Sequence, residues 1–397
     1  MTRRRLLSSA PPATLPPLED DDLLSFILHR LPPLPSTLPR ASLVCKRWRR
    51  IVSDPSFLRG FRAHHRKPPL LGLFHSDAQD AGYIRFIPAL DPPDRIPAAR
   101  FPLWVENQRR CRIIGIRHGR VLFIDRKRRR FLVWEPLAGG RHSVPFPPPP
   151  DGMAGGMKKN GAILCAASDQ GHVHGSCHSA PFQVISLSCS RKLISACVYS
   201  SETNGWGNAI SLPWPPNTAS CCSSTTDWPN TMVGNSICWM LMGRTAAILL
   251  FDLDRKNLCV VEVPPDAYDR NAVDNYGCQL LITPADNGGL GLLVLSGGDY
   301  TVRVWKRKSE RHGVSGWMLQ NTVELNSHLL SLMRPGFNTL PLVILGFAEE
   351  DNAMFLRTPG GATFMIHLDS AEFKKLPESM HYGCCCHPFK SFYTAGM

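Results

Sequence analysis

Residues 18–58 constrain the fold more than any other part of the chain, because apolar spacing, charge and proline positions agree there. Apolar residues recur at helical intervals between Leu23 and Leu31 and form one stripe. Acidic residues at 19–22 precede the stripe, where the positive end of the helix dipole favours them. Prolines from Pro32 onward end the helix, because proline has no backbone N–H to donate.

Two more helices follow in the same segment. The second can begin near Pro39, which suits a first-turn position, and its apolar residues again fall on one side. Either Ser53 or Asp54 can cap a third helix, with Pro55 at its first position. About 40 residues cannot bury three apolar faces against one another, so we expect a large partner surface. The competing interpretation is an amphipathic hairpin that packs on its own domain.

This segment resembles an F-box in the order and spacing of its residues. One departure is Leu18-Glu19, where the family usually has Leu-Pro, and we expect it to loosen the entry to the first helix. The resemblance implies docking on a Skp1-type adaptor and, through it, on a cullin ubiquitin ligase. The matching runs are Leu18, Asp22-Leu23-Leu24, Ile27-Leu28, Arg30-Leu31-Pro32, Ala41-Ser42-Leu43-Val44-Cys45-Lys46-Arg47-Trp48 and Ser53-Asp54-Pro55-Ser56-Phe57-Leu58.

The resemblance also indicates the adaptor-binding residues, which we expect to divide between internal packing and the adaptor interface. Trp48 is the predicted anchor, because buried tryptophan contributes strongly to such surfaces. The predicted set is Leu18, Leu23, Leu24, Ile27, Leu28, Leu31, Pro32, Leu43, Val44, Cys45, Trp48, Ile51 and Val52.

Length and charge fit a multidomain chain with a basic start. A chain of 397 residues suits two or more domains. The formal net charge is +13, and residues 1–67 alone hold 13 basic and 5 acidic residues. Such a unit favours an acidic partner, which can be nucleic acid or an acidic adaptor protein.

Cysteine usage and targeting signals indicate a reduced intracellular protein, cytoplasmic or nuclear and not secreted. The chain has 14 cysteines, yet several are adjacent, as at Cys221-Cys222, and adjacent cysteines rarely bridge each other. It has no Asn-x-Ser/Thr acceptor site, no signal peptide and no apolar run of the ~20 residues that span a bilayer. Residues 1–17 are rich in Arg, Ser and Pro, and we expect them to be disordered.

From about residue 70 the sequence predicts β-structure. Short apolar runs alternate with turn residues, and a strand, a polar turn and a returning strand recur. We therefore predict a three-helix F-box (18–62), a linker (63–69) and an all-β propeller of about six to seven irregular blades (70–397), an α+β multidomain chain. A β-sandwich or two smaller β domains are the alternatives. The aromatic or aliphatic anchors of the repeat are Phe86, Trp134, Tyr199, Phe251, Trp305 and Ile366, and Ile84–Pro97 is its degenerate first copy.

The β region resembles the F-box-associated β-propeller of grass F-box proteins. The resemblance implies that the propeller binds a protein substrate through loops on one rim. The matching runs are Arg117-His118-Gly119-Arg120-Val121-Leu122, Val198-Tyr199-Ser200-Ser201-Glu202-Thr203, Leu345-Gly346-Phe347-Ala348-Glu349 and His387-Pro388-Phe389.

Motifs for catalysis, cofactors and metals are not recognised, and we predict a non-catalytic protein without a cofactor or metal. Walker A, Gly-x-Ser-x-Gly and His-Glu-x-x-His patterns are absent. His172, His174, Cys177 and His178 are spaced too tightly for the two-pair arrangement of structural zinc, and we interpret them as a loop. Cys384-Cys385-Cys386-His387 is interpreted as a strand end with buried thiols. Two hypotheses compete with the ligase adaptor: an enzyme or metal-dependent binder that uses the channel, and a basic nucleic-acid scaffold.

Overall fold

The structure, a computed structural model, separates into two compact units, residues 1–68 with 392–397 and residues 69–391. Each unit is described by itself. The tail expected to be disordered, 1–17, lies outside the described residues. The residues described are 20–76, 84–101, 111–149, 158–168, 172–175, 177–190, 192–215, 229–242, 245–267, 280–285, 288–296, 301–308, 316–325, 342–377 and 385–393.

The first unit consists of short helices with strong capping signals. Helix α1 (Asp21–His29) begins at Asp20, whose Oδ1 accepts hydrogen bonds from the backbone N–H groups of Asp22 (2.8 Å) and Leu23 (3.1 Å). Of the two candidate caps for the last helix, Asp54 is the one used: it caps α4 (Pro55–His65), with Pro55 at the first position. Helix α4 continues to His65, inside the segment expected to be a linker.

The second of the three predicted helices is divided in two, α2 (Thr37–Ser42) and α3 (Lys46–Ser53). The division falls at Cys45, whose backbone is extended (φ −162°, ψ 170°) and cannot continue a helix. Its Sγ accepts a hydrogen bond from the backbone N–H of Trp48 (3.5 Å), so Cys45 caps α3. A break of this kind leaves Leu43 and Val44 in a turn.

The second unit is a six-bladed β-propeller built from six antiparallel sheets. Short 3₁₀ turns lie at Ala98–Arg100, Pro265–Ala267 and Glu349–Asp351. The strands, sheet by sheet, are β1 (Leu70–Ser76), β2 (Ile84–Pro88) and β24 (Cys385–Lys390); β3 (Cys111–Arg117), β4 (Arg120–Asp125), β5 (Arg130–Trp134) and β6 (Arg141–Pro145); β7 (Lys158–Cys165), β8 (Phe182–Cys189), β9 (Leu193–Ser200), β10 (Gly205–Trp206) and β11 (Ile210–Pro213); β12 (Thr231–Val233), β13 (Ser236–Leu241), β14 (Ala247–Asp252) and β15 (Asn257–Glu262); β16 (Leu280–Pro284), β17 (Leu290–Ser296), β18 (Thr301–Lys308) and β19 (Gly316–Glu324); β20 (Val343–Ala348), β21 (Ala353–Arg357), β22 (Thr363–His367) and β23 (Glu372–Lys375).

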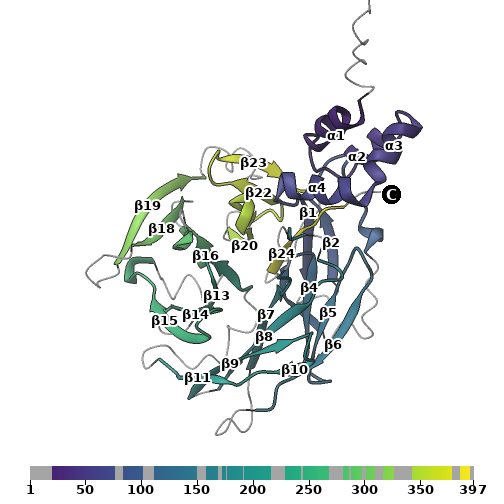
Figure 1. Cartoon of the computed structure of the whole chain (residues 1–397). Coiled ribbons are helices and arrows are strands. Elements are labelled where there is room, and N and C mark those ends of the chain that lie inside the picture. The colour runs from purple at the N-terminus through teal and green to yellow at the C-terminus, as the bar shows by residue number, and fades with distance from the viewer. Residues whose placement is uncertain are drawn as a thin grey trace, which may run out of the picture. The chain divides into compact units, whose positions relative to one another are not determined.

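The sheets are arranged around a centre formed by one edge strand from each: β24, β3, β7, β12, β16 and β20. Strands β24, β3 and β7 lie side by side, and so do β12, β16, β20 and β24. Figure 1 shows β7, β16, β20 and β24 toward the middle of the propeller, with β15 and β19 farther out. Tight hairpins connect the strands within a blade; between β3 and β4 both turn residues, His118 and Gly119, have positive φ, as a two-residue hairpin turn requires.

The ring is closed by pairing the two ends of the propeller sequence. Strand β24 pairs antiparallel with β1, with Leu73 opposite Pro388 and Phe74 opposite His387. The predicted anchors lie on the third strand of each sheet, and Phe86 on β2 occupies that position in the first. The described residues 89–101 that follow β2 contain no strand, so the described part of the first sheet has three strands, with β24 as the innermost.

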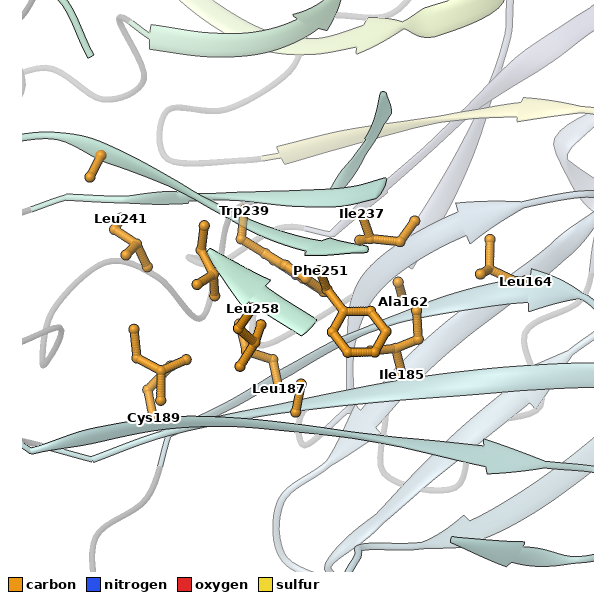
Figure 2. Close-up of a cluster of buried hydrophobic side chains, with 14 residues drawn as sticks. Ala162, Leu164, Ile185, Leu187, Cys189, Ile237, Trp239, Leu241, Phe251 and Leu258 are labelled. Carbon is orange, nitrogen blue, oxygen red and sulfur yellow. The ribbon is translucent and has the colours of Figure 1, made fainter. Parts of the chain in front are cut away.

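Apolar side chains fill the spaces between adjacent blades. Figure 2 shows one such cluster, where Trp239 and Phe251 of the fourth sheet meet Ala162, Ile185 and Leu187 of the third. Trp239 is 1% exposed and Phe251 is fully buried. Further buried clusters lie between other neighbouring sheets, and their burial stabilises the ring by the hydrophobic effect. Across the described residues, no helix has the length and apolarity that a membrane crossing needs.

Candidate functional site

The structure places the predicted adaptor-binding residues in three environments. Leu18 lies outside the described residues. Leu24, Leu28 and Val52 are fully or almost fully buried and form the helical core with Leu38, Ala41, Phe57 and Phe61. Leu31, Trp48 and Ile51 are partly buried and pack against that core. The remaining predicted residues are exposed: Leu23, Ile27, Pro32, Leu43, Val44 and Cys45.

Large apolar side chains are concentrated on the surface of the helical unit. Of the seven large apolar side chains that are exposed among the described residues, five belong to it. The exposed fractions are highest in the turn between α2 and α3, with Leu43 at 74% and Val44 at 61%. We call these five the exposed apolar set: Leu23, Phe26, Ile27, Leu43 and Val44.

Phe26 belongs to this set and was not predicted from the sequence. It is 52% exposed, and the guanidinium carbon of Arg30 lies 4.0 Å from the centroid of its ring. The signal was present: Leu23, Phe26, Ile27 and Arg30 follow i, i+3, i+4, i+7 spacing, a second face beside the buried Leu24 and Leu28. Treating all the apolar residues as one stripe hid this outer face.

A basic group borders the exposed apolar set. Arg47 and Arg50 of α3 form ion pairs with Asp21 of α1, at 2.6 Å and 2.9 Å. The hydrogen bond from Arg47 is the main reason that the pKa of Asp21 lies below its ordinary value of 3.8. Lys46 and Arg49 on the same helix are exposed. An apolar surface with a basic rim fits a partner that offers apolar pockets edged by acidic groups.

A polar network joins the inner strands of the propeller. Arg117 at the end of β3 donates to Asn230 Oδ1 and to Glu349 Oε1, both at 2.9 Å. Glu349 also accepts from the backbone N–H of Met232 (3.0 Å), and Asn230 donates to the carbonyls of Ile114 and Gly161. Burial raises the pKa of Glu349, while the Arg117 guanidinium opposes that shift. Because these groups satisfy one another across four sheets, their role is to hold the ring together.

A second polar site lies beside an open pocket. Arg120 and Glu135 are 1% and 3% exposed and form an ion pair of 2.9 Å. Arg120 Nη2 also donates to the carbonyl oxygens of Cys177 and Ala180. The pocket is lined by Arg120, Glu135, Arg141, His142, Ser143, His178, Ser179, Ala180, Pro181, Phe182, Tyr199, Ser201, Glu202 and Asn204. Its mixed charges and loop walls make it a candidate contact surface for a client protein.

Several thiols lie inside blades. Burial raises the pKa of Cys111 to about 11 and that of Cys238 to about 12, which keeps both thiols protonated at neutral pH. Cys386 on β24 is buried and Cys385 is partly buried, as the strand-end interpretation predicts. Cys384 lies outside the described residues.

His172, His174 and Cys177 do come together in the loop after β7, but the group differs from the one that the sequence analysis considered. The structure joins them to Cys165 at the end of β7 and leaves His178 out of the cluster. Six residues lie between Cys165 and His172, which is why the sequence pattern did not include Cys165.

Two family models match the chain. The F-box domain model matches residues 20–60, and the model described as "F-box protein AT5G49610-like, beta-propeller" matches residues 112–394. No curated protein matches the chain. The match fits the expectation of a plant F-box protein, while the narrower grass-type expectation stays a prediction.

Solved structures similar to the chain are distant. The nidogen/laminin complex has 10% identity and a TM-score of 0.40, with 80% of this chain and 98% of that chain covered. A functionally unknown protein from Desulfotomaculum acetoxidans DSM 771 has 12% identity and a TM-score of 0.37, with 81% and 84% covered. Scores this low carry no information about function.

Proposed function

The chain belongs to the family of AT5G49610-like F-box β-propeller proteins, and on that premise we propose that it is the substrate-recognition subunit of an SCF-type ubiquitin ligase. The helical unit binds a Skp1-type adaptor, which links it to a cullin. The propeller binds a client protein. The chain itself makes and breaks no bonds; it raises the effective concentration of client lysines near the ubiquitin-conjugating enzyme.

The exposed apolar set supports this proposal most directly. A stable monomeric unit gains nothing from leaving Leu43 and Val44 exposed, whereas a docking surface needs apolar anchors in its centre. Leu24, Leu28 and Val52 already complete the helical core, so the five exposed residues are available to a partner. The basic residues beside them fit an acidic adaptor better than a neutral one.

Client binding is assigned to the loops around the pocket that Arg120, Arg141 and Glu202 line. These loops connect strands within the third sheet, and loops held by a rigid scaffold often carry binding residues. The ligase assignment also implies a cytoplasmic or nuclear protein. The client and the signal that it carries follow from neither the fold nor the family.

The test is titration of the full chain with a purified Skp1-type adaptor. Ile27→Asp and Leu43→Asp place a charge in the proposed interface, and each is expected to weaken binding by about tenfold or more. The matched controls are Met318→Asp and Leu319→Asp, which alter the exposed large apolar residues of the propeller strand β19. Equal affinities for interface and control variants, or a folded wild-type chain that does not bind, would contradict the proposal.

A further inference from the structure

Four metal-ligating side chains converge where β7 ends and the following loop begins. They are Cys165, His172, His174 and Cys177, and one ligand atom from each lies within 4.8 Å of the other three. His172 Nε2 is 3.4 Å from Cys165 Sγ and 3.3 Å from Cys177 Sγ. His174 Nδ1 is 3.7 Å from Cys177 Sγ. His172 Nε2 therefore lies at nearly equal distances from the two sulfur atoms.

The three sulfur–nitrogen separations are close to those of a tetrahedral zinc site. Zinc binds thiolate sulfur at about 2.3 Å and imidazole nitrogen at about 2.0–2.1 Å, so neighbouring ligand atoms lie about 3.6 Å apart at the tetrahedral angle. The three sulfur–nitrogen separations, 3.3, 3.4 and 3.7 Å, lie close to this value. Two thiolates and two imidazoles form a donor set that zinc and other thiophilic ions prefer over Mg²⁺ or Ca²⁺.

We propose that this cluster is a structural Zn²⁺ site, with Cys165 Sγ, His172 Nε2, His174 Nδ1 and Cys177 Sγ as the four ligands. Four protein ligands close the coordination sphere and leave no position for a substrate. Binding displaces the protons of the two thiols into solvent, and the two thiolates balance the charge of the ion. The proposal does not depend on adaptor binding, because the four ligands lie in the propeller and not in the helical unit.

The surroundings orient the ligands. The ring of His118 stacks on that of His174, with centroids 3.7 Å apart and planes 12° from parallel. His118 Nδ1 also accepts a hydrogen bond from the backbone N–H of Cys165 (3.0 Å). One residue of the β3–β4 turn therefore positions both a histidine and a cysteine of the cluster, the supporting role that second residues play around metal ligands.

The site has a consequence for the pocket beside it. The carbonyl oxygens of Cys177 and Ala180 receive hydrogen bonds from Arg120, and His178 and Ser179 form part of the pocket wall. A metal that fixes Cys177 also fixes this wall. The zinc therefore shapes the candidate client surface while it takes no part in chemistry.

The test is the metal content of the purified full chain, prepared without chelators and measured by mass spectrometry of the metal. We expect about one zinc per chain in the wild type and a loss of that zinc in the Cys165→Ala/Cys177→Ala double variant. Cys259→Ser, which removes an exposed cysteine, and His178→Ala, which removes the histidine next to the cluster, are the matched controls and keep the metal. Equal zinc content in the double variant and the controls would overturn the proposal.

A second measurement needs no variant and so does not depend on how well one folds. The wild-type chain is alkylated with N-ethylmaleimide before and after removal of metal by a chelator, and each cysteine is followed by peptide mass spectrometry. Chelation is expected to increase the labelling of Cys165 and Cys177 several-fold and to leave that of Cys259 unchanged. Unchanged labelling of the two cluster thiols, or their recovery as a disulfide, would overturn the proposal. Added Co²⁺ should give the visible absorption of a tetrahedral thiolate site in the metal-free chain.

Discussion

The helical unit leaves large apolar side chains on its surface, whereas the described part of the propeller buries nearly all of its own. In the helical unit Leu43 and Val44 are mostly exposed, although the segment that carries them is short. In the much longer propeller, the exposed large apolar residues among those described are Met318 and Leu319, at 39% and 45%. The propeller can bury its apolar faces because each blade has neighbours on both sides and β24 closes the ring against β1.

The propeller buries its apolar surface within itself, whereas the helical unit needs a partner to bury its outer apolar residues. A unit of about 45 residues cannot enclose both an inner and an outer apolar face, so the outer face has to be covered from outside or left in water. The propeller covers its apolar faces by packing its own blades against one another. Substitutions in the two regions should consequently have different outcomes.

The largest effect is expected for Phe389→Ala in the closing strand. Phe389 is fully buried, and the centroid of its ring lies 5.2 Å from that of the Phe74 ring and 5.7 Å from that of the Phe101 ring. Its loss should lower the free energy of unfolding of the propeller by ~3–5 kcal/mol, since a large cavity forms where the two ends meet. Denaturant unfolding followed by tryptophan fluorescence measures this, and adaptor affinity serves as the control. If Phe389→Ala strongly weakened adaptor binding while the propeller stayed folded, the proposed difference between the two regions would be wrong.

In the helical unit, core and surface leucines should separate stability from binding. Leu28→Ala removes a buried side chain and should destabilise this unit by ~2–5 kcal/mol. Leu43→Ala should change its stability by less than about 0.5 kcal/mol and still weaken adaptor binding. Hydrogen exchange of the α1–α4 amides in the full chain reports the first effect, and titration reports the second. If Leu43→Ala destabilised the helices as much as Leu28→Ala, the surface assignment would be wrong.

The two regions should also differ in their sensitivity to acid. Burial lowers the pKa of His387 on β24 to about 3, with Arg112 of β3 and His75 of β1 adding to the shift. The unfolded chain binds a proton at that histidine below about pH 6.5, so propeller stability should fall as pH drops from there toward 3, by an amount on the order of a few kcal/mol. His387→Gln should flatten this dependence. A slope unchanged by that substitution would assign the acid sensitivity to other groups.

The smallest effect concerns Asp21 in the helical unit. Its pKa is lowered by Arg47 and Arg50, so the stability that it contributes is present above pH 3.8 and disappears as pH falls through the lower folded value. Asp21→Asn should remove that acid-dependent part and little else, because the pair is exposed and screened by salt. The change in stability of the helical unit is measured by following the amide signals of α1–α4 during thermal unfolding, at low and at high salt. A large loss at neutral pH that persists in 1 M salt would contradict this.

Local pattern was sufficient to predict most of the helical unit. The acids before Leu23, the prolines after Leu31 and Pro55 at a helix start all lie where the structure uses them. The pattern could not show the break at Cys45, because a cysteine has no strong preference for a cap position and its extended backbone follows from packing. It also could not separate inner from outer apolar residues, so Phe26 was missed.

In the propeller, the repeat predicted the third strand of each blade, and the predicted range of six to seven blades contains the six that form. The closing pair β24–β1 joins residues more than 300 positions apart, and no local pattern encodes such a contact. The Cys165 cluster was missed for a different reason, because its residues are close in sequence, between positions 165 and 177. Cys165 ends a strand and its partners lie in the next loop, so only the folded chain brings them together.

The most direct test of the central claim is hydrogen–deuterium exchange of the full chain with and without a Skp1-type adaptor. We predict that protection on binding is confined to α1 and to the segment from α2 to α3, where the exposed apolar set lies, while the blades exchange as before. Protection that appears in the blades while α1 and residues 37–53 remain unchanged would contradict the claim that the helical unit is the part completed by a partner.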